Sequence, residues 1–245
     1  MINWLKQLEN AHDVEILFAC EAGSRAWGME SPTSDYDIRF IYIHKDLHRY
    51  LSIDPPKEVL EEGPFDAVGW DIMKACKLLR KSNPSLYEWC MSPIYYIDKH
   101  GFSEILKKII KEGYSHYALF HHYESLCTRN LHEVKEKSYH EKRQKQLIYA
   151  VRSILIVQEM ILKKELFFDF RMNEANLKEN QLYQFYSDLL AAKDKQTLLS
   201  EKKVQDLVSL IEQEKQRLAH EAMTLAKGRD ITVELNEWLW SLLGV

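Results

Sequence analysis

The segment Gly23-Ser-Arg-Ala-Trp-Gly-Met-Glu-Ser-Pro-Thr-Ser-Asp-Tyr-Asp37 carries the strongest structural signal in this chain. It lies between two apolar runs, Val14–Cys20 and Ile38–Ile43, which are strand-length and rich in β-branched and aromatic residues. The stretch therefore predicts a strand, a glycine-serine turn, a connector, and a second strand that carries two aspartates.

The two aspartates, Asp35 and Asp37, are two positions apart, so on a strand they point to the same face. Like charges on one face repel each other. A bound Mg²⁺ would replace this repulsion with attraction, because the ion takes carboxylate oxygens as ligands and keeps waters and phosphates as its other ligands. Gly23 lets the backbone approach a ligand closely, and Ser24 adds a hydroxyl beside it. These residues predict a site for Mg²⁺ or Mn²⁺ and a phosphate; the alternative is a surface hairpin with incidental acidic residues.

A family resemblance rests on this combination of Gly23-Ser24, a ten-residue spacer and Asp35-x-Asp37. It resembles the signature of the DNA polymerase β-like nucleotidyltransferase superfamily. The wider run Gly-Ser-Arg-Ala-Trp-Gly…Ser-Asp-Tyr-Asp-Ile-Arg is similar to a bacterial branch of predicted nucleotidyltransferases associated with RNA repair. The resemblance implies a metal-dependent enzyme that moves a nucleoside monophosphate from a nucleoside triphosphate, such as ATP, to an acceptor hydroxyl. An RNA 3′ end is one candidate acceptor, and pyrophosphate is released.

Such a site needs a third carboxylate on a neighbouring strand, and Asp66 and Asp71 are the candidates. Asp66 lies within the strand pattern Phe65–Trp70, as the superfamily's third acid does. Asp71 falls on the opposite strand face by parity and is a good N-cap for the helix that follows. We therefore predict that Asp66 joins Asp35 and Asp37 as a catalytic metal ligand and acts as general base.

Four polar side chains of the first half are candidates for nucleotide binding beside Gly23 and Ser24. Arg25 adjoins the proposed phosphate turn and has the planar donor group that phosphates favour; otherwise it is a solvated loop arginine. Ser34 either contacts a phosphate or closes a turn. Arg39 either neutralises the carboxylates or contacts the triphosphate. Lys74 follows the third predicted strand by one helical turn, and we favour a role at the nucleotide.

In the second half, Lys145, Tyr149 and Arg152 are spaced i, i+4 and i+7, which places them on one stripe of a helix. Val151 and Leu155 belong to a separate apolar face of the same helix. The resembled family has a Lys…Tyr…Arg arrangement at this helix, which implies contacts with the nucleotide base and phosphates. The alternative is an amphipathic helix with ordinary polar residues.

Proline and glycine predict how the chain divides. All six prolines lie at or before Pro93, and neither residue occurs between Tyr114 and Lys227. Because these residues break regular structure most strongly, we expect an α+β protein. Residues 1–112 would form the nucleotidyltransferase domain with a mixed sheet, and residues 113–245 an all-α helical bundle. Within the first domain we interpret residues 44–62 as a loop, and within the second Phe167–Phe170 as a connector.

The bulk composition is that of an ordinary globular protein, with 46% hydrophobic residues and a net charge of −4. No apolar run reaches membrane-spanning length, and the N-terminus lacks a signal-peptide pattern. The four cysteines are scattered without metal-ligand spacing, which favours free thiols in a reducing cytoplasm. The sequence thus predicts a cytoplasmic protein with no membrane partner, and it leaves the oligomeric state open.

Two other functions are compatible with the sequence. One is a non-catalytic nucleotide-binding regulator, and the other is an antitoxin-like interaction protein whose helical half forms the interface. A turnover assay separates both from the enzyme.

Overall fold

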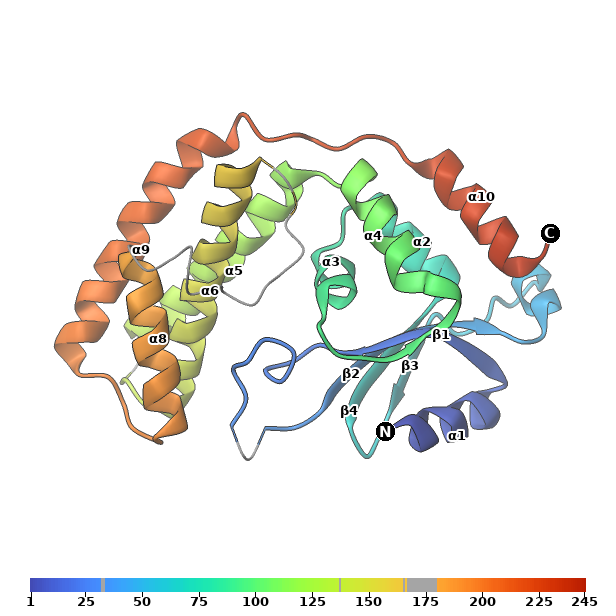
Figure 1. Cartoon of the computed structure of the whole chain (residues 1–245), viewed down its shortest axis with the longest axis horizontal. Coiled ribbons are helices and arrows are strands. Elements are labelled where there is room, and N and C mark those ends of the chain that lie inside the picture. Colours follow the sequence, from blue (N-terminus) through green and yellow to red (C-terminus); the bar gives the residue numbers. More distant parts are fainter. Residues whose placement is uncertain (32–33, 137, 165, 167–179) are drawn as a thin grey trace. The chain divides into compact units, whose positions relative to one another are not determined.

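The computed structural model describes residues 1–31, 34–136, 138–164, 166 and 180–245 (Figure 1). They form two compact units, one of Met1–Tyr114 with Gly228–Val245 and one of Ser115–Lys227. The fold is mixed α+β, as the sequence predicts, with a five-stranded sheet in the first part of the chain and a helical region after it.

The sheet has the strand order β3-β4-β2-β1-β5. Its strands are β1 (Val14–Glu21), β2 (Asp37–His44), β3 (Val59–Glu62), β4 (Asp66–Asp71) and β5 (Tyr95–Asp98). β2 and β4 are parallel, whereas the pairs β1/β2, β1/β5 and β3/β4 are antiparallel. As a consequence, β1 ends where β2 and β4 begin, and these three strand termini meet at one end of the sheet.

Helices cover both faces of this sheet (Figure 1). On one face lies α1 (Ile2–His12), whose Leu5 and Leu8 share a buried cluster with Ile38 and Phe40. On the other lie α2 (Ile72–Arg80), α3 (Pro84–Met91) and α4 (Phe102–Gly113). Because side chains alternate along a strand, the odd-numbered residues at the start of β2 face away from α1.

The last helix, α10 (Thr232–Leu243), belongs to the same unit as the sheet and packs against α2. Its Leu235 and Leu239 are buried, and the Trp238 ring lies 5.0 Å from that of Phe102. The first unit is therefore built from two segments that are far apart in the chain.

The second unit contains long helices, as expected from its lack of proline and glycine. They are α5 (His116–Glu136), α6 (Glu141–Lys163), α8 (Gln181–Asp194) and α9 (Glu201–Ala222). The predicted connector at Phe167–Phe170 lies outside the described residues. Among the helices that are described, none combines the length and apolarity that crossing a membrane requires.

The interpretation of residues 44–62 as a loop is wrong in part. This region contains a 3₁₀ helix, η1 (Leu47–Leu51), and the edge strand β3. β3 has four residues, of which only Leu60 is buried. A strand of four residues that ends in two exposed glutamates is too short to show an alternating pattern, and short, charged strands of this kind are common at sheet edges.

Candidate active site

Two adjacent strands each begin with an aspartate, at the end of the sheet where β1 ends. Asp37 is the first residue of β2 and Asp66 the first of β4, and they are register partners in the parallel pair. Arg39 lies beside both: its Nη1 is 3.0 Å from Asp66 Oδ1, and its Nη2 is 3.8 Å from Asp37 Oδ1. Arg39 Nη1 also donates to the Asp66 carbonyl oxygen at 2.8 Å. The structure thus gives Arg39 the neutralising position that was one of its two predicted roles.

The electrostatics of this pair favour a cation. Burial raises the pKa of Asp37 above its ordinary value, a hydrogen bond with Asp66 and the charges of Asp66 and Glu21 raise it further, and Arg39 opposes them. Carboxylates in this environment gain from any positive charge that reaches them. Carboxylate oxygens are also the ligands that Mg²⁺ takes from proteins, so the donor chemistry of the pair fits a divalent cation.

Gly23 lies against the Asp37 carboxylate. A Cβ atom at position 23 would be 1.4 Å from Asp37 Oδ2, so only glycine leaves room for that side chain. The chain then turns through residues 24–28, with Ala26 N–H donating to the Gly23 carbonyl oxygen and Trp27 N–H to that of Ser24. No backbone carbonyl oxygen among the described residues accepts a hydrogen bond from the backbone N–H of Ser24. This N–H and the Ser24 hydroxyl are available to an anion at the start of the turn.

The loop before β2 is held by Arg25. Its Nη2 donates to the Ser34 carbonyl oxygen at 2.6 Å and its Nε to that of Asp35 at 3.2 Å. The guanidinium also lies over the Tyr36 ring, 4.3 Å from its centroid. Arg25 is therefore engaged within the loop rather than solvated, and a phosphate contact would be additional to this role.

Ser34 and Asp35 lie in the loop before β2 and not on the strand that begins with Asp37. The Ser34 hydroxyl accepts a hydrogen bond from Ser31 N–H at 2.8 Å, which is the turn-closing role predicted as one alternative. Asp35 is exposed and precedes β2 instead of lying on it. The shared strand face expected for Asp35 and Asp37 is thus not formed. Within the described ranges, no group of three or more His, Cys, Asp or Glu side chains is arranged to hold a metal ion.

Asp71, the other candidate for the third carboxylate, has the structural role that its position predicted. It is 1% exposed, accepts a hydrogen bond from Met73 N–H at 2.8 Å as the N-cap of α2, and accepts another from the Tyr50 hydroxyl at 2.5 Å. It lies at the far end of β4 from Asp66, about 16 Å away at the rise of a strand. The geometry therefore brings Asp66, and not Asp71, beside Asp37.

Lys74 is likewise beyond the far end of β4. Its ammonium lies 5.9 Å from the centroid of the Trp70 ring, and the centroids of the Trp70 and Trp89 rings are 4.0 Å apart. No described contact joins Lys74 to the carboxylate pair, so its role at a nucleotide stays a prediction.

The predicted stripe of the second unit differs in its burial. Lys145 is exposed and Tyr149 is half-buried, whereas Arg152 is only 5% exposed. Arg152 lowers the pKa of Tyr186 on α8, although burial outweighs it and raises that pKa to about 12. The expectation that all three side chains lie outside the packed face of α6 is therefore wrong for Arg152, because α8 covers that part of the helix.

One residue at this end of the sheet was missed by the sequence analysis. Glu21, the last residue of β1, is 0% exposed, and its side chain accepts hydrogen bonds from Asp37 N–H and from the Tyr96 hydroxyl. A charged residue directly after the apolar run Val14–Cys20 was the available signal, since an acid there either leaves the sheet or is buried with partners.

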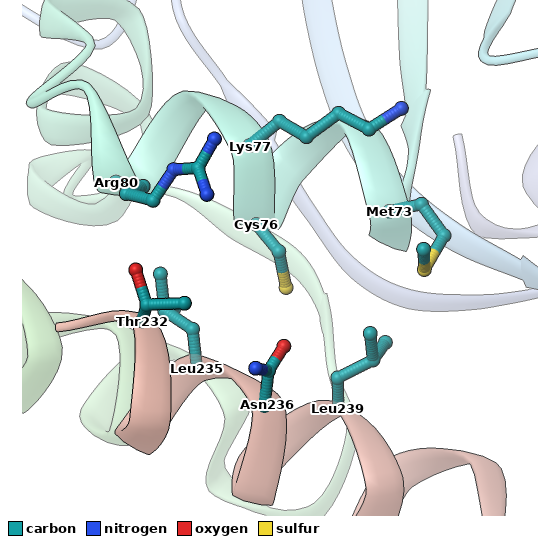
Figure 2. A pocket seen from close by; sticks show the side chains of 8 residues that line it. All are labelled: Met73, Cys76, Lys77, Arg80, Thr232, Leu235, Asn236 and Leu239. Carbon is teal, nitrogen blue, oxygen red and sulfur yellow. The ribbon is translucent and has the colours of Figure 1, made fainter.

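A pocket of about 100 Å³ lies elsewhere in the first unit, between α2 and α10 (Figure 2). Cys76 points across it from α2, and Leu235, Asn236 and Leu239 point toward α2 from α10. Its lining consists of Met73, Cys76, Lys77, Arg80, Thr232, Leu235, Asn236 and Leu239. None of the predicted site residues lines it, so it is separate from the carboxylate pair.

Comparison with known proteins gives two matches. The family model RlaP, described as the RNA repair pathway DNA polymerase beta family, matches residues 1–241. The chain is also 34% identical over 249 residues to "Uncharacterized protein YcgL" of Bacillus subtilis (strain 168), with 98% of this chain and 94% of that protein covered. A match over nearly the whole chain includes both compact units as well as the Gly23 turn and the two strand-opening carboxylates. The chain therefore belongs to the RlaP family, the RNA repair pathway family of the DNA polymerase β superfamily.

Proposed function

We propose that this protein is a metal-dependent nucleotidyltransferase that transfers a nucleoside monophosphate from a nucleoside triphosphate to an acceptor hydroxyl. The observation that carries the proposal is the placement of Asp37 and Asp66 side by side, with the Gly23 turn against Asp37. Family membership supports the reaction class and favours an RNA 3′ end as the acceptor. The four cysteines are free and buried, in keeping with the reducing cytoplasm that we propose as its location.

In this proposal Asp37 and Asp66 hold Mg²⁺ or Mn²⁺, together with Asp35 from the preceding loop. The bound ion would supply charge neutralisation at the phosphates, which is the larger part of catalysis in phosphoryl chemistry. The N–H and hydroxyl of Ser24 bind phosphate oxygens at the start of the turn. Arg39 neutralises the carboxylates in the metal-free protein, and in this proposal it contacts the triphosphate once the ion is bound.

The chemical step is an in-line displacement. The acceptor hydroxyl oxygen forms a bond to the α-phosphorus, the bond from that phosphorus to the bridging oxygen breaks, and pyrophosphate leaves. The hydroxyl proton passes to Asp66, the more exposed of the two carboxylates, as general base. The nucleotide-binding roles of Lys74, Lys145, Tyr149 and Arg152 belong to the same proposal.

The test incubates the protein with each α-labelled nucleoside triphosphate, Mg²⁺ or Mn²⁺, and RNA with a free 3′ hydroxyl. We expect label on the RNA with wild type and loss of at least about 100-fold with Asp37→Asn, since a metal ligand is removed. Asp71→Asn is the matched control and should retain activity, because asparagine also caps helices.

Absence of transfer to RNA, protein or small hydroxyl compounds with all four triphosphates would contradict the enzyme. Tight triphosphate binding without turnover would then favour the nucleotide-binding regulator, and neither binding nor turnover would favour the interaction protein.

A further inference from the structure

Glu21 connects three strands at the carboxylate end of the sheet. Its Oε1 accepts the Asp37 backbone N–H at 2.8 Å, and its Oε2 accepts the hydroxyl of Tyr96, on β5, at 2.5 Å. The Glu21 carbonyl oxygen accepts the Ser92 hydroxyl at 2.5 Å. The side chain and backbone of Glu21 are thus both fixed, and the backbone of Asp37 is fixed through them.

The charge of Glu21 is costly where it lies. A fully buried carboxylate loses its hydration, and this one is also close enough to the like charge of Asp37 to raise the pKa of that carboxyl. A neutral glutamine offers the same carbonyl acceptor to Asp37 N–H, and its amide NH₂ can donate to the Tyr96 oxygen in place of the bond that Oε2 accepts, without that cost. Packing and hydrogen bonding alone therefore do not explain why the residue is acidic.

A divalent cation beside Asp37 does explain it. A buried negative charge behind a ligand strengthens the attraction for the cation, and groups that orient metal ligands in this way change metal affinity by about 10–100-fold. We propose that Glu21 is a positioning residue for Asp37: it fixes the backbone from which that carboxylate is presented and adds the negative charge that holds a divalent cation there. The inference rests on the proposed function, because it requires the cation.

The test measures Mn²⁺ binding to the full chain, with the free ion followed by electron paramagnetic resonance. Glu21→Gln should weaken Mn²⁺ affinity by about 10-fold or more. Its melting temperature should be unchanged or higher, because a buried charge is removed while an acceptor is kept. A merely structural role gives the reverse, a lower melting temperature with unchanged affinity.

Two further variants keep the result interpretable. Tyr96→Phe removes only the hydroxyl that orients Glu21, and it should weaken Mn²⁺ binding several-fold. Tyr42→Phe is its matched control, because the Tyr42 hydroxyl donates to the Lys57 carbonyl oxygen toward the other end of β2, and its affinity should equal that of wild type.

The possible failures are distinguishable. Wild type that binds Mn²⁺ while Glu21→Gln binds it equally well overturns the inference and leaves the proposed function intact. If Glu21→Gln does not fold, Tyr96→Phe decides, and equal affinity to wild type again overturns the inference. Wild type that binds no Mn²⁺, alone or with a triphosphate, overturns both.

Discussion

Asp37 and Asp66 are register partners on two parallel strands, and a single guanidinium, that of Arg39, lies beside both carboxylates. In the absence of a metal ion, Arg39 is thus the positive charge that offsets the mutual repulsion of the two acids. This arrangement makes the stability of the first unit depend on cations in a way that can be measured.

We expect Arg39→Met to lower the free energy of unfolding by about 1.5–3 kcal/mol, the range for hydrogen bonds to charged groups. Mn²⁺ should restore part of the loss, because a bound cation replaces the missing guanidinium. Lys99→Met is the matched control: Lys99 also bridges two carboxylates, those of Glu9 and Glu15 at 3.1 and 3.0 Å, but elsewhere in the unit. Thermal unfolding of both variants with and without Mn²⁺ checks this, and equal rescue of the two would contradict a metal site at Asp37.

Gly23→Ala should displace the Asp37 carboxylate, since the added Cβ would lie 1.4 Å from Asp37 Oδ2. Overpacking of this kind costs about 1–3 kcal/mol, and Mn²⁺ binding should be lost with it. Gly63→Ala serves as control, because nothing lies within 4 Å of its added Cβ. Calorimetric titration with Mn²⁺ measures the outcome. Normal binding by Gly23→Ala would show that the close approach has no role in the site.

The buried carboxyl of Asp71 should make the stability of the folded state depend on pH. Burial raises its pKa above the ordinary value, and the hydrogen bonds from Tyr50 and Met73 oppose this. Because the unfolded chain then ionises this carboxyl more easily than the folded one, the folded state loses stability as pH rises through the interval between the two pKa values. Asp71→Asn keeps an N-cap without that loss.

The variant Asp71→Asn should therefore be as stable as wild type or more stable at pH 7. Its advantage should shrink below about pH 4, where the carboxyl is protonated in both states. Urea unfolding of the two proteins at pH 7 and below about pH 4 tests this. If the stability advantage of Asp71→Asn grows toward low pH, the pKa of Asp71 is lowered and not raised by folding.

Arg152→Ala should destabilise the second unit by about 2–4 kcal/mol, as truncation of a large buried side chain does. Arg217→Ala is the exposed comparison: Arg217 pairs with Glu214 and Glu221 on α9, and its loss should cost less than about 1 kcal/mol. Thermal unfolding distinguishes the two. The sequence also predicts that Arg152→Ala weakens triphosphate binding by about 1.5–3 kcal/mol, and unchanged affinity in a folded variant would remove Arg152 from the nucleotide site.

Much of the fold could be predicted because each central strand is marked by local pattern. The apolar runs on either side of Gly23 to Asp37 gave β1 and β2, and Asp71 and Asn83 marked helix starts as N-caps. β3 could not be predicted in this way, because it is held by contacts with distant parts of the chain: its pairing with β4, the burial of Leu60 and the bond between Glu62 and His12. The sequence also did not show that α10 packs on the first unit, because amphipathic periodicity indicates that a helix has a packed face but does not identify the surface on which it packs.

The site could be predicted in part for a similar reason. Strand parity and capping distinguished Asp66 from Asp71, since both are local properties of the sequence. The spacing of Asp35 and Asp37 predicted a shared face only if both lay on a strand, and β2 begins at Asp37. Glu21 accepts a hydrogen bond from the Asp37 N–H, sixteen positions along the chain. A contact between residues so far apart in sequence produces no periodic pattern, so it could not be predicted.

The packing of α10 on α2 has a consequence for biosynthesis. The sheet and α1 to α4 are made first, but their unit lacks a covering helix until Gly228–Val245 has left the ribosome. The intervening Ser115–Lys227 unit is complete earlier and can fold before it. Until then, Met73 and Cys76 on α2 lack the α10 residues that face them, so nascent chains stalled before Gly228 should be the form that chaperones retain.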